Sequence, residues 1–283
     1  MHRVYERTGR LAGRPARSDV PHLSFYVVAH QDDWQLFYGQ QAFADLQETD
    51  SRVVFIYTTA GDAGQPNGWW QAREQGALAA QGAPLGNLET VTINGHSVAM
   101  HEAGSFASYH LRLPDGNVNG SGFPSTGNVS LEKLQIGCVS QIEAVDESTT
   151  YTSWGDFCAT LGEIIGREAL QPNVWVNAAD WSWNCSPEDH SDHKATGNAL
   201  RNVFCQQGNV FHRLWFVTYS TKSRPTNLSG EALRQKESVW LAYKQQVAAL
   251  ADAELLRWEW EQWGAKNYSR RVLAGEEDID PWL

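Results

Sequence analysis

The chain has 283 residues, of which 42% are hydrophobic and 19% charged, a composition typical of one large or two smaller globular domains. Its formal net charge of −11 argues against a nucleic-acid partner and against docking on an anionic membrane surface. The 13 tryptophans fill a core or line a cleft for a carbohydrate or apolar ligand, and composition does not separate the two.

Residues 1–21 are basic and polar, so we expect no secretory signal there. The sequence has no long apolar stretch, so we expect no membrane-spanning helix. A cytoplasmic location is the prediction, with secretion as the alternative because the chain has four cysteines and an N-terminus that processing could have trimmed. Without a Cys-x-x-Cys pair, the cysteines predict no structural zinc site. They form either up to two disulfides or buried thiols: Cys138, Cys158, Cys185 and Cys205.

The first predicted elements are a strand over residues 23–29 and a helix over residues 33–46. The strand is almost wholly apolar, as in a parallel sheet buried on both faces. His30, Asp32 and Asp33 stand where the strand ends and the helix begins. Ligands bind at such junctions in open α/β sheets.

His30 and Asp33 are three residues apart, so both side chains can converge on one point beside the first helical turn. One imidazole and one carboxylate form half of a site for zinc or another divalent metal. Asp32 should point elsewhere, where a carboxylate can take a proton from metal-bound water. The alternative is that one of the two aspartates caps the helix.

Further along, residues 51–59 predict a second strand that ends in a glycine-rich turn, and residues 69–81 predict a helix. The turn is either a tight strand-to-helix connection or a ligand cradle, but no Lys-Ser/Thr follows it, so it is not a P-loop. Residues 87–93 predict a third strand. Residues 94–128 are rich in Gly, Asn, Ser and Pro, and we interpret them as a long functional or mobile loop.

In the second half, residues 151–170 predict a helix, residues 172–178 a buried strand and residues 194–207 another helix. Alternating strands and helices predict an α/β fold with a parallel sheet. His190, Asp192 and His193 therefore stand at a second strand-to-helix junction. Together with His30 and Asp33, one of these histidines would complete three metal ligands and leave a fourth position open, as in catalytic zinc sites. The alternative is that the histidines only hydrate the helix N-terminus.

The C-terminal part predicts a last strand over residues 210–220, a long amphipathic helical segment over residues 231–263 and an acidic tail over residues 275–283. We expect one domain over residues 1–283. Its core would span about residues 22–222, with a helical extension and tail over residues 223–283.

Four motifs, in order, resemble those of the PIG-L/LmbE-like N-acetylglucosaminyl deacetylases. Residues 29–33 resemble the family's Ala-His-Pro-Asp-Asp, and residues 58–64 its Thr-x-Gly-Glu-x-Gly turn. Arg73 and Glu74 stand where the family has an Arg-Glu pair, and residues 190–193 resemble its His-Pro-Asp-His.

This resemblance implies a Rossmann-like, mostly parallel sheet with helices on both faces, one zinc ion, and hydrolysis of an N-acetyl group on an amino sugar. It implies that the metal ligands are His30, Asp33 and His193. It also implies that Asp32 is the general base and that His190 assists the oxyanion or the leaving amine. Asp192 would hold His190 in its charged form or fix its tautomer.

Some positions depart from the family pattern. Gln31 and Ser191 replace prolines, Trp34 replaces an acidic residue, Asp62 replaces Glu, and Gly76 stands where a second helix Glu is common. These departures suggest a divergent branch with a bulky, aromatic or lipidic conjugate as substrate. The predicted substrate contacts are Arg73, Trp34, Trp69, Trp70 and Trp183, with Trp181 as a further candidate, although the tryptophans could equally be packed in the core.

Two other functions are compatible with these residues. His30-x-Asp32 with a distant His is also the spacing of a non-haem iron oxygenase, which would bind metal through Asp32 rather than Asp33. A sugar- or lipid-binding protein that has lost catalysis is the second alternative. The expected partner is a small N-acetylated amino-sugar conjugate, without nucleic acid and without stable membrane insertion.

Overall fold

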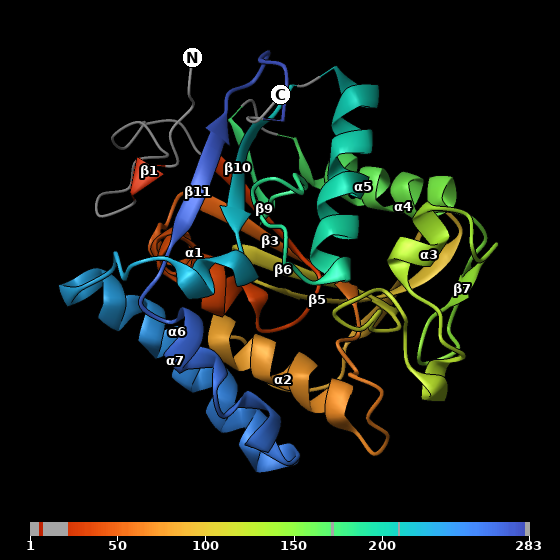
Figure 1. The fold of residues 1–283 in the computed structure, drawn as a ribbon, viewed down its shortest axis with the longest axis horizontal. Helices are drawn as coiled ribbons and strands as arrows, with labels where there is room; N and C mark the ends of the chain where they lie inside the picture. Colours follow the sequence, from red (N-terminus) through yellow and green to blue (C-terminus); the bar gives the residue numbers. More distant parts are fainter. Residues whose placement is uncertain (1–5, 8–21, 171–172, 209, 281–283) are drawn as a thin grey trace.

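The computed structural model describes residues 6–7, 22–170, 173–208 and 210–280. One large sheet runs through the molecule, with helices on both of its faces (Figure 1). Its strands are β1 (Glu6–Arg7), β2 (His22–Val28), β3 (Ser51–Thr59), β4 (Glu89–Ile93), β5 (His96–Ala103), β6 (Phe106–Leu113), β9 (Val174–Ala179), β10 (His212–Val217) and β11 (Tyr268–Val272). A separate pair is formed by β7 (Ile142–Glu143) and β8 (Thr150–Tyr151).

The strand order is β1-β11-β10-β9-β2-β3-β6-β5-β4. The central strands from β10 to β6 are parallel, and the strands at both edges pair antiparallel. The predicted α/β fold with a mostly parallel sheet is therefore confirmed. The chain leaves β2 in one direction toward β3 and β6, and in the other toward β9 and β10, so β2 is the topological switch point where ligands bind in such sheets.

The helices fill two layers. The α-helices are α1 (Gly39–Gln47), α2 (Trp69–Gln81), α3 (Leu131–Gln135), α4 (Trp154–Glu168), α5 (Ser191–Gln207), α6 (Gly230–Leu250) and α7 (Glu259–Trp263). The other helical turns are the π-helical η1 (Trp34–Tyr38) and the 3-10 helices η2 (Pro124–Thr126), η3 (Tyr219–Ser223) and η4 (Ala253–Leu256). Helix α6 runs beside α2 and α1, and α4 lies beside α5 in the other layer (Figure 1).

Alternation along the buried strands produces two hydrophobic cores. In β2, Phe25 and Val27 face a core shared with α4 and α5, whereas Tyr26 and Val28 face a core shared with α1, α2 and α6. Both faces of β2 are therefore covered, as its nearly continuous apolar run predicted.

Three expectations about the elements need correction. Residues 94–128 are not one loop, because they contain β5 and β6. Strand β6 is almost wholly buried and pairs with β3, and the Gly, Asn, Ser and Pro residues around it concealed a central strand. The extension after residue 222 is not only helical, since it supplies β11, which pairs with β10. The long helical segment ends at Leu250, and α7 is a separate short helix.

Other early expectations have clear outcomes. Of residues 1–21, only Glu6–Arg7 lie within the described residues, and they form an edge strand on β11. Cys138, Cys158 and Cys205 form no disulfide, so the two-disulfide arrangement is not present. Among the described residues, no helix combines the length and apolarity needed to cross a membrane.

Candidate metal and catalytic site

The candidate site lies where parallel strands end side by side. Strands β9, β2, β3 and β6 are neighbours, so their carboxyl ends bring four segments to the same edge of the sheet. These segments are 190–193 before and in α5, 30–33 after β2, 59–64 after β3, and 113–115 after β6. Residues more than 150 positions apart in the chain thereby face one another.

His30, Asp33 and His193 form a buried cluster. Asp33 Oδ1 lies 2.9 Å from His193 Nε2 and 3.4 Å from His30 Nδ1, and one donor atom from each residue lies within 4.8 Å of the others. Two imidazole nitrogens and a carboxylate oxygen are a donor set that suits zinc. Asp33 does not cap the following helix through its side chain, so the capping alternative does not describe it.

The surroundings of this cluster favour a cation. Burial opposes charging of His193, but Asp33 and Asp189 raise its pKa to about 10. Burial likewise opposes charging of His30, but Asp33, Asp192 and Asp115 raise its pKa well above the usual value. Both imidazoles are drawn toward the charged form because carboxylates outnumber cationic groups here. A bound metal ion would supply that positive charge instead.

Asp189 fixes the orientation of His193. Its Oδ1 lies 2.7 Å from His193 Nδ1, and its Oδ2 accepts a hydrogen bond from the hydroxyl of Thr218. This contact leaves His193 Nε2 directed at Asp33, the tautomer that a metal ligand requires. Sequence reasoning missed Asp189, although its spacing of four residues before His193 on the entry to a helix was a usable signal.

Asp32 points away from the metal cluster, as its position between two ligands predicted. It forms an ion pair with the Arg73 guanidinium, whose Nη1 also donates to the Gly61 carbonyl at 3.0 Å. Gly61 has φ +55°, and a Cβ there would lie 2.7 Å from the Gln31 side chain, so only glycine fits between Gln31 and Arg73. Since Asp33 rather than Asp32 joins the histidines, the geometry gives no support to the iron-oxygenase alternative.

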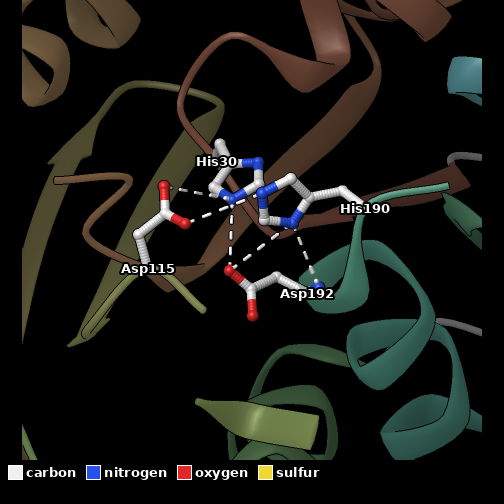
Figure 2. A group of neighbouring side chains, drawn as sticks. All are labelled: His30, Asp115, His190 and Asp192. Atoms are coloured by element: carbon white, nitrogen blue, oxygen red, sulfur yellow. Dashed lines mark hydrogen bonds and ion pairs between the residues drawn. The ribbon is translucent and has the colours of Figure 1, made fainter. Parts of the chain in front are cut away.

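A second group of buried side chains adjoins the first (Figure 2). His30 Nε2 lies 3.3 Å from Asp192 Oδ2 and 3.8 Å from Asp115 Oδ2, and His190 Nε2 lies 3.6 Å from Asp115 Oδ1. If His30 held a metal ion through Nδ1, its Nε2 would carry the proton and donate to Asp192. The four residues of the second group also bring one donor atom each within 4.8 Å of the others, so they form a second set of possible metal ligands.

His190 is held in a defined tautomer, but not by the Asp192 carboxylate as expected. The backbone N–H of Asp192 donates to His190 Nδ1 at 3.2 Å, so His190 caps α5 and its Nε2 carries the proton. The Asp192 carboxylate is 3.7 Å from His190 Nδ1 and accepts instead from the backbone N–H of Gly116 at 2.8 Å. Burial and the neighbouring His30 lower the pKa of His190 to about 4, which corrects the expectation of a charged imidazole.

Asp115 is a site residue that the sequence interpretation missed. It follows the carboxyl end of β6, and its backbone N–H donates to Asp62 Oδ1 at 2.7 Å. Asp62 therefore binds the backbone that carries Asp115, which explains the carboxylate in the glycine-rich turn. The usable signal was an aspartate directly after a strand at this edge, but β6 had been interpreted as part of a loop.

The two residues that replace family prolines also have structural roles. Gln31 Nε2 donates to the Thr59 carbonyl at 3.0 Å and joins the ends of β2 and β3. The Ser191 backbone N–H donates to the Val118 carbonyl at 3.0 Å, a bond that proline cannot make. Ser191 thereby anchors the loop after Asp115 to α5.

A pocket of about 220 Å³ opens over these groups. Its lining residues come from both the sheet edge and the C-terminal extension: His30, Asp32, Ala63, Trp69, Arg73, Asp115, Asn117, Val118, Phe123, His190, Tyr219, Leu256 and Glu259. Arg73 and Trp69 thus line the pocket, as the expected substrate contacts should.

Other expected contacts lie elsewhere. Trp34 is fully buried in the core, where its Nε1 donates to the Tyr57 hydroxyl at 3.0 Å, so it cannot form the substrate rim. Trp70 packs beneath the Arg112 guanidinium, and Trp183 is 58% exposed with the Lys194 ammonium 3.2 Å from its ring centroid. Trp181 lines a different pocket. None of these four tryptophans lines the pocket over His30.

The Arg-Glu pair of α2 serves two separate purposes. Arg73 faces the pocket, whereas Glu74 turns toward Arg112, with Oε2 2.8 Å from Arg112 Nη2. Arg112 in turn contacts Asp146 at 2.6 Å. Gly76 lies against α6, where a Cβ would come within 2.6 Å of Val247 and 2.9 Å of Tyr243, so no larger residue fits in this helix contact.

A comparison with known protein families shows which family the chain belongs to. The family profile PIG-L, described as GlcNAc-PI de-N-acetylase, matches residues 25–204, which is more than half of the chain. The chain belongs to the PIG-L family. The matched PIG-L region carries the cluster of His30, Asp33 and His193 together with Asp32, Arg73 and His190, and it ends before the extension that contributes to the pocket.

Several solved structures are similar to this PIG-L member at low identity. A deacetylase from teicoplanin biosynthesis is 14% identical, with a TM-score of 0.49, 88% of this chain covered and 96% of the other. The N,N'-diacetylchitobiose deacetylase of Pyrococcus horikoshii is 15% identical, with a TM-score of 0.48 and coverage of 91% and 85%. The A40926 pseudoaglycone deacetylase is 14% identical, with a TM-score of 0.45 and coverage of 90% and 98%. Among curated proteins, none matches.

Proposed function

We propose that this PIG-L member is a zinc-dependent hydrolase that removes the acetyl group from the nitrogen of an N-acetylated amino-sugar conjugate. The observation that carries the proposal is the meeting of His30, Asp33 and His193 around one point, with Asp32 outside that set but on the same pocket. A hydrolytic metal site has this arrangement: three protein ligands, and beside them a carboxylate that does not bind the metal.

The residues fit zinc in number and chemistry. His30 Nδ1, Asp33 Oδ1 and His193 Nε2 would hold the ion. When bound, zinc polarises the amide carbonyl and lowers the pKa of a bound water to about 7. Asp189 and Asp192 support this role, since each contacts the second nitrogen of a ligand imidazole.

Asp32 is placed to act as general base. Its carboxylate lines the pocket, and Arg73 holds it in one orientation through the ion pair. Asp32 takes a proton from the attacking water, whose oxygen forms the new bond to the amide carbon. The C–N bond then breaks, and the proton on Asp32 is available to the leaving nitrogen, so that acetate and a free amine are released.

His190 is placed to stabilise the oxyanion. Its Nδ1 accepts the backbone N–H of Asp192, so its Nε2–H points toward the pocket as a neutral donor. A fixed donor aimed at the developing negative charge contributes about 3–4 kcal/mol in well-studied hydrolases. Asp115 Oδ1 lies 3.6 Å from this nitrogen, beyond hydrogen-bond distance, so the N–H remains available to the oxyanion.

An amino-sugar substrate is favoured by the family description and by the pocket. Polar groups for sugar hydroxyls and apolar surfaces from Trp69, Phe123 and Leu256 line the same space. At about 220 Å³, the pocket is smaller than a typical drug-sized site of about 300–1,000 Å³, so it suits one sugar ring with the conjugate projecting outward.

The test combines metal analysis with acetate release. We expect about one zinc per chain, acetate release from N-acetylglucosamine conjugates, and loss of that activity on treatment with a chelator followed by recovery with zinc. Sugar binding that is insensitive to chelator, without any acetate, would instead favour the catalytically inactive binding protein.

A further inference from the structure

The far wall of the pocket is built by residues outside the region that the PIG-L profile matches. Tyr219 begins η3, Leu256 ends η4 and Glu259 begins α7, all beyond residue 204. The blue helices of the extension lie along the same face as α2 in Figure 1. The extension is therefore part of the site and not only a support for the sheet.

Aromatic packing ties this wall to the catalytic segment. The Tyr219 ring stacks on Trp263 at 4.7 Å between centroids, and Trp263 packs against Phe37 at 5.7 Å. Phe37 lies in η1, which begins directly after Asp33. The position of α7, and of Glu259 at its start, is thus fixed relative to the metal ligands.

Glu259 has no partner for a buried polar atom. Its Oε2 is inaccessible to solvent and makes no hydrogen bond among the described residues. Arg73 lines the same pocket, but its Nη2 and Nη1 bind Asp32 and the Gly61 carbonyl, and its Nε makes no hydrogen bond to Glu259 or to any other described residue. A buried polar group without a partner costs free energy, so a ligand that pairs with Glu259 recovers this free energy on binding.

The electrostatics around Glu259 suit a hydroxyl group. Burial and the nearby Asp32 raise the pKa of Glu259 well above the usual value, while Arg73 opposes them. A protonated carboxyl both donates and accepts hydrogen bonds, as a sugar hydroxyl does. The apolar surfaces of Leu256 and Trp69 in the same pocket suit the C–H face of a sugar ring.

We propose that Glu259 is a specificity-determining residue that hydrogen-bonds a hydroxyl group of the substrate's sugar ring. The inference rests on the proposed function, because it assumes that the ring enters the pocket with its N-acetyl group facing His30 and Asp32. It extends that function by assigning ring recognition to the C-terminal extension.

The experiment measures kcat and KM for acetate release with Glu259→Leu and Glu259→Gln. The substrates are the methyl glycoside of N-acetylglucosamine and its 3-, 4- and 6-deoxy analogues. Glu261→Leu is the matched control, since Glu261 lies in the same helix, is exposed and does not line the pocket.

We expect Glu259→Leu to lower kcat/KM for the complete sugar by about 10-fold, the equivalent of one hydrogen bond to a strongly polar group. The loss should appear mainly in KM. It should vanish for the one deoxy analogue that lacks the recognised hydroxyl, whereas Glu259→Gln retains most of the activity and Glu261→Leu all of it. Thermal unfolding checks that the variants are folded, and Glu259→Ala replaces Glu259→Leu if that variant is not.

Two results would overturn the inference while leaving the hydrolase in place: an unchanged kcat/KM in Glu259→Leu, or an equal loss for every analogue. If the wild type releases no acetate, calorimetric titration with the same methyl glycosides separates the two proposals. If Glu259→Leu binds the complete sugar more weakly than the wild type does, but binds one deoxy analogue equally well, the Glu259 contact is supported without hydrolysis. Equal binding in both proteins, or none in either, rejects it.

Discussion

The two sides of the pocket differ in how their charges are balanced. On the side of the sheet, Asp33 contacts His30 and His193, Asp32 pairs with Arg73, and the second imidazole nitrogens face further aspartates. On the side of the extension, the Oε2 of Glu259 has no partner among the described residues. The sheet side thus places carboxylates against imidazoles and a guanidinium, whereas the extension side offers the pocket a buried carboxyl oxygen without a hydrogen bond.

The largest expected effect belongs to the sheet side. Asp32→Asn should lower acetate release by about 10²- to 10⁴-fold, because the amide cannot accept the proton of the attacking water. Zinc content should stay at the wild-type level, since Asp32 is not among the metal-ligand cluster. Metal analysis and acetate release on the same preparation check both statements.

His193→Ala is the matched contrast for that variant, because it should lose metal and activity together. Equal activity of Asp32→Asn and the wild type would remove Asp32 from the mechanism. Loss of metal in Asp32→Asn would place Asp32 among the ligands and return the oxygenase-like arrangement to consideration.

A smaller effect is expected where a carboxylate only orients a ligand. Asp189→Asn should weaken zinc affinity by about 10- to 100-fold, since the carboxylate that holds His193 Nδ1 is replaced by a neutral amide. Competition with a chromophoric chelator measures this affinity. An unchanged affinity would show that packing alone orients His193 and that the charge of Asp189 is not used.

The attachment of the extension to the core gives a third test. Gly76→Ala should reduce the free energy of unfolding by about 1–3 kcal/mol, because a Cβ would clash with Val247 and Tyr243 of α6. Gly166→Ala in α4 is the control: no atom lies within 4 Å of its Cβ position, so a gain of up to about 1 kcal/mol is expected. Urea unfolding measures both, and equal effects would mean that α6 can shift away from α2.

The smallest effect concerns an aromatic side chain outside both sides of the pocket. Trp183→Ala should leave KM and kcat within about twofold of the wild type, the equivalent of about 0.4 kcal/mol, because the Trp183 side chain does not line the pocket. Its ring is 58% exposed and contacts Lys194 rather than the pocket. A large rise in KM would show that bound conjugates reach over the rim to Trp183.

Sequence patterns located the first side of the pocket well. The apolar runs of β2 and β9 bury both faces of a parallel sheet, and the ionisable residues that follow them end at one edge because parallel strands share their direction. His30, Asp33 and one of His190 or His193 were therefore predictable as neighbours, and the resemblance to the family selected His193. Asp115 was not, because β6 lies in a stretch rich in Gly, Asn, Ser and Pro that resembles a loop until β3 and β5 are seen beside the strand.

By itself, then, the sequence determined that two strand ends carry His and Asp side chains at spacings that suit a metal, since that depends on local pattern and on the apolar runs of the strands. Only the tertiary structure decided what surrounds that metal site. Trp34 is a core residue and Glu259 a pocket residue because of how α6 and α7 pack on the sheet, and such packing depends on shape complementarity between distant segments. Local residue patterns do not contain that information.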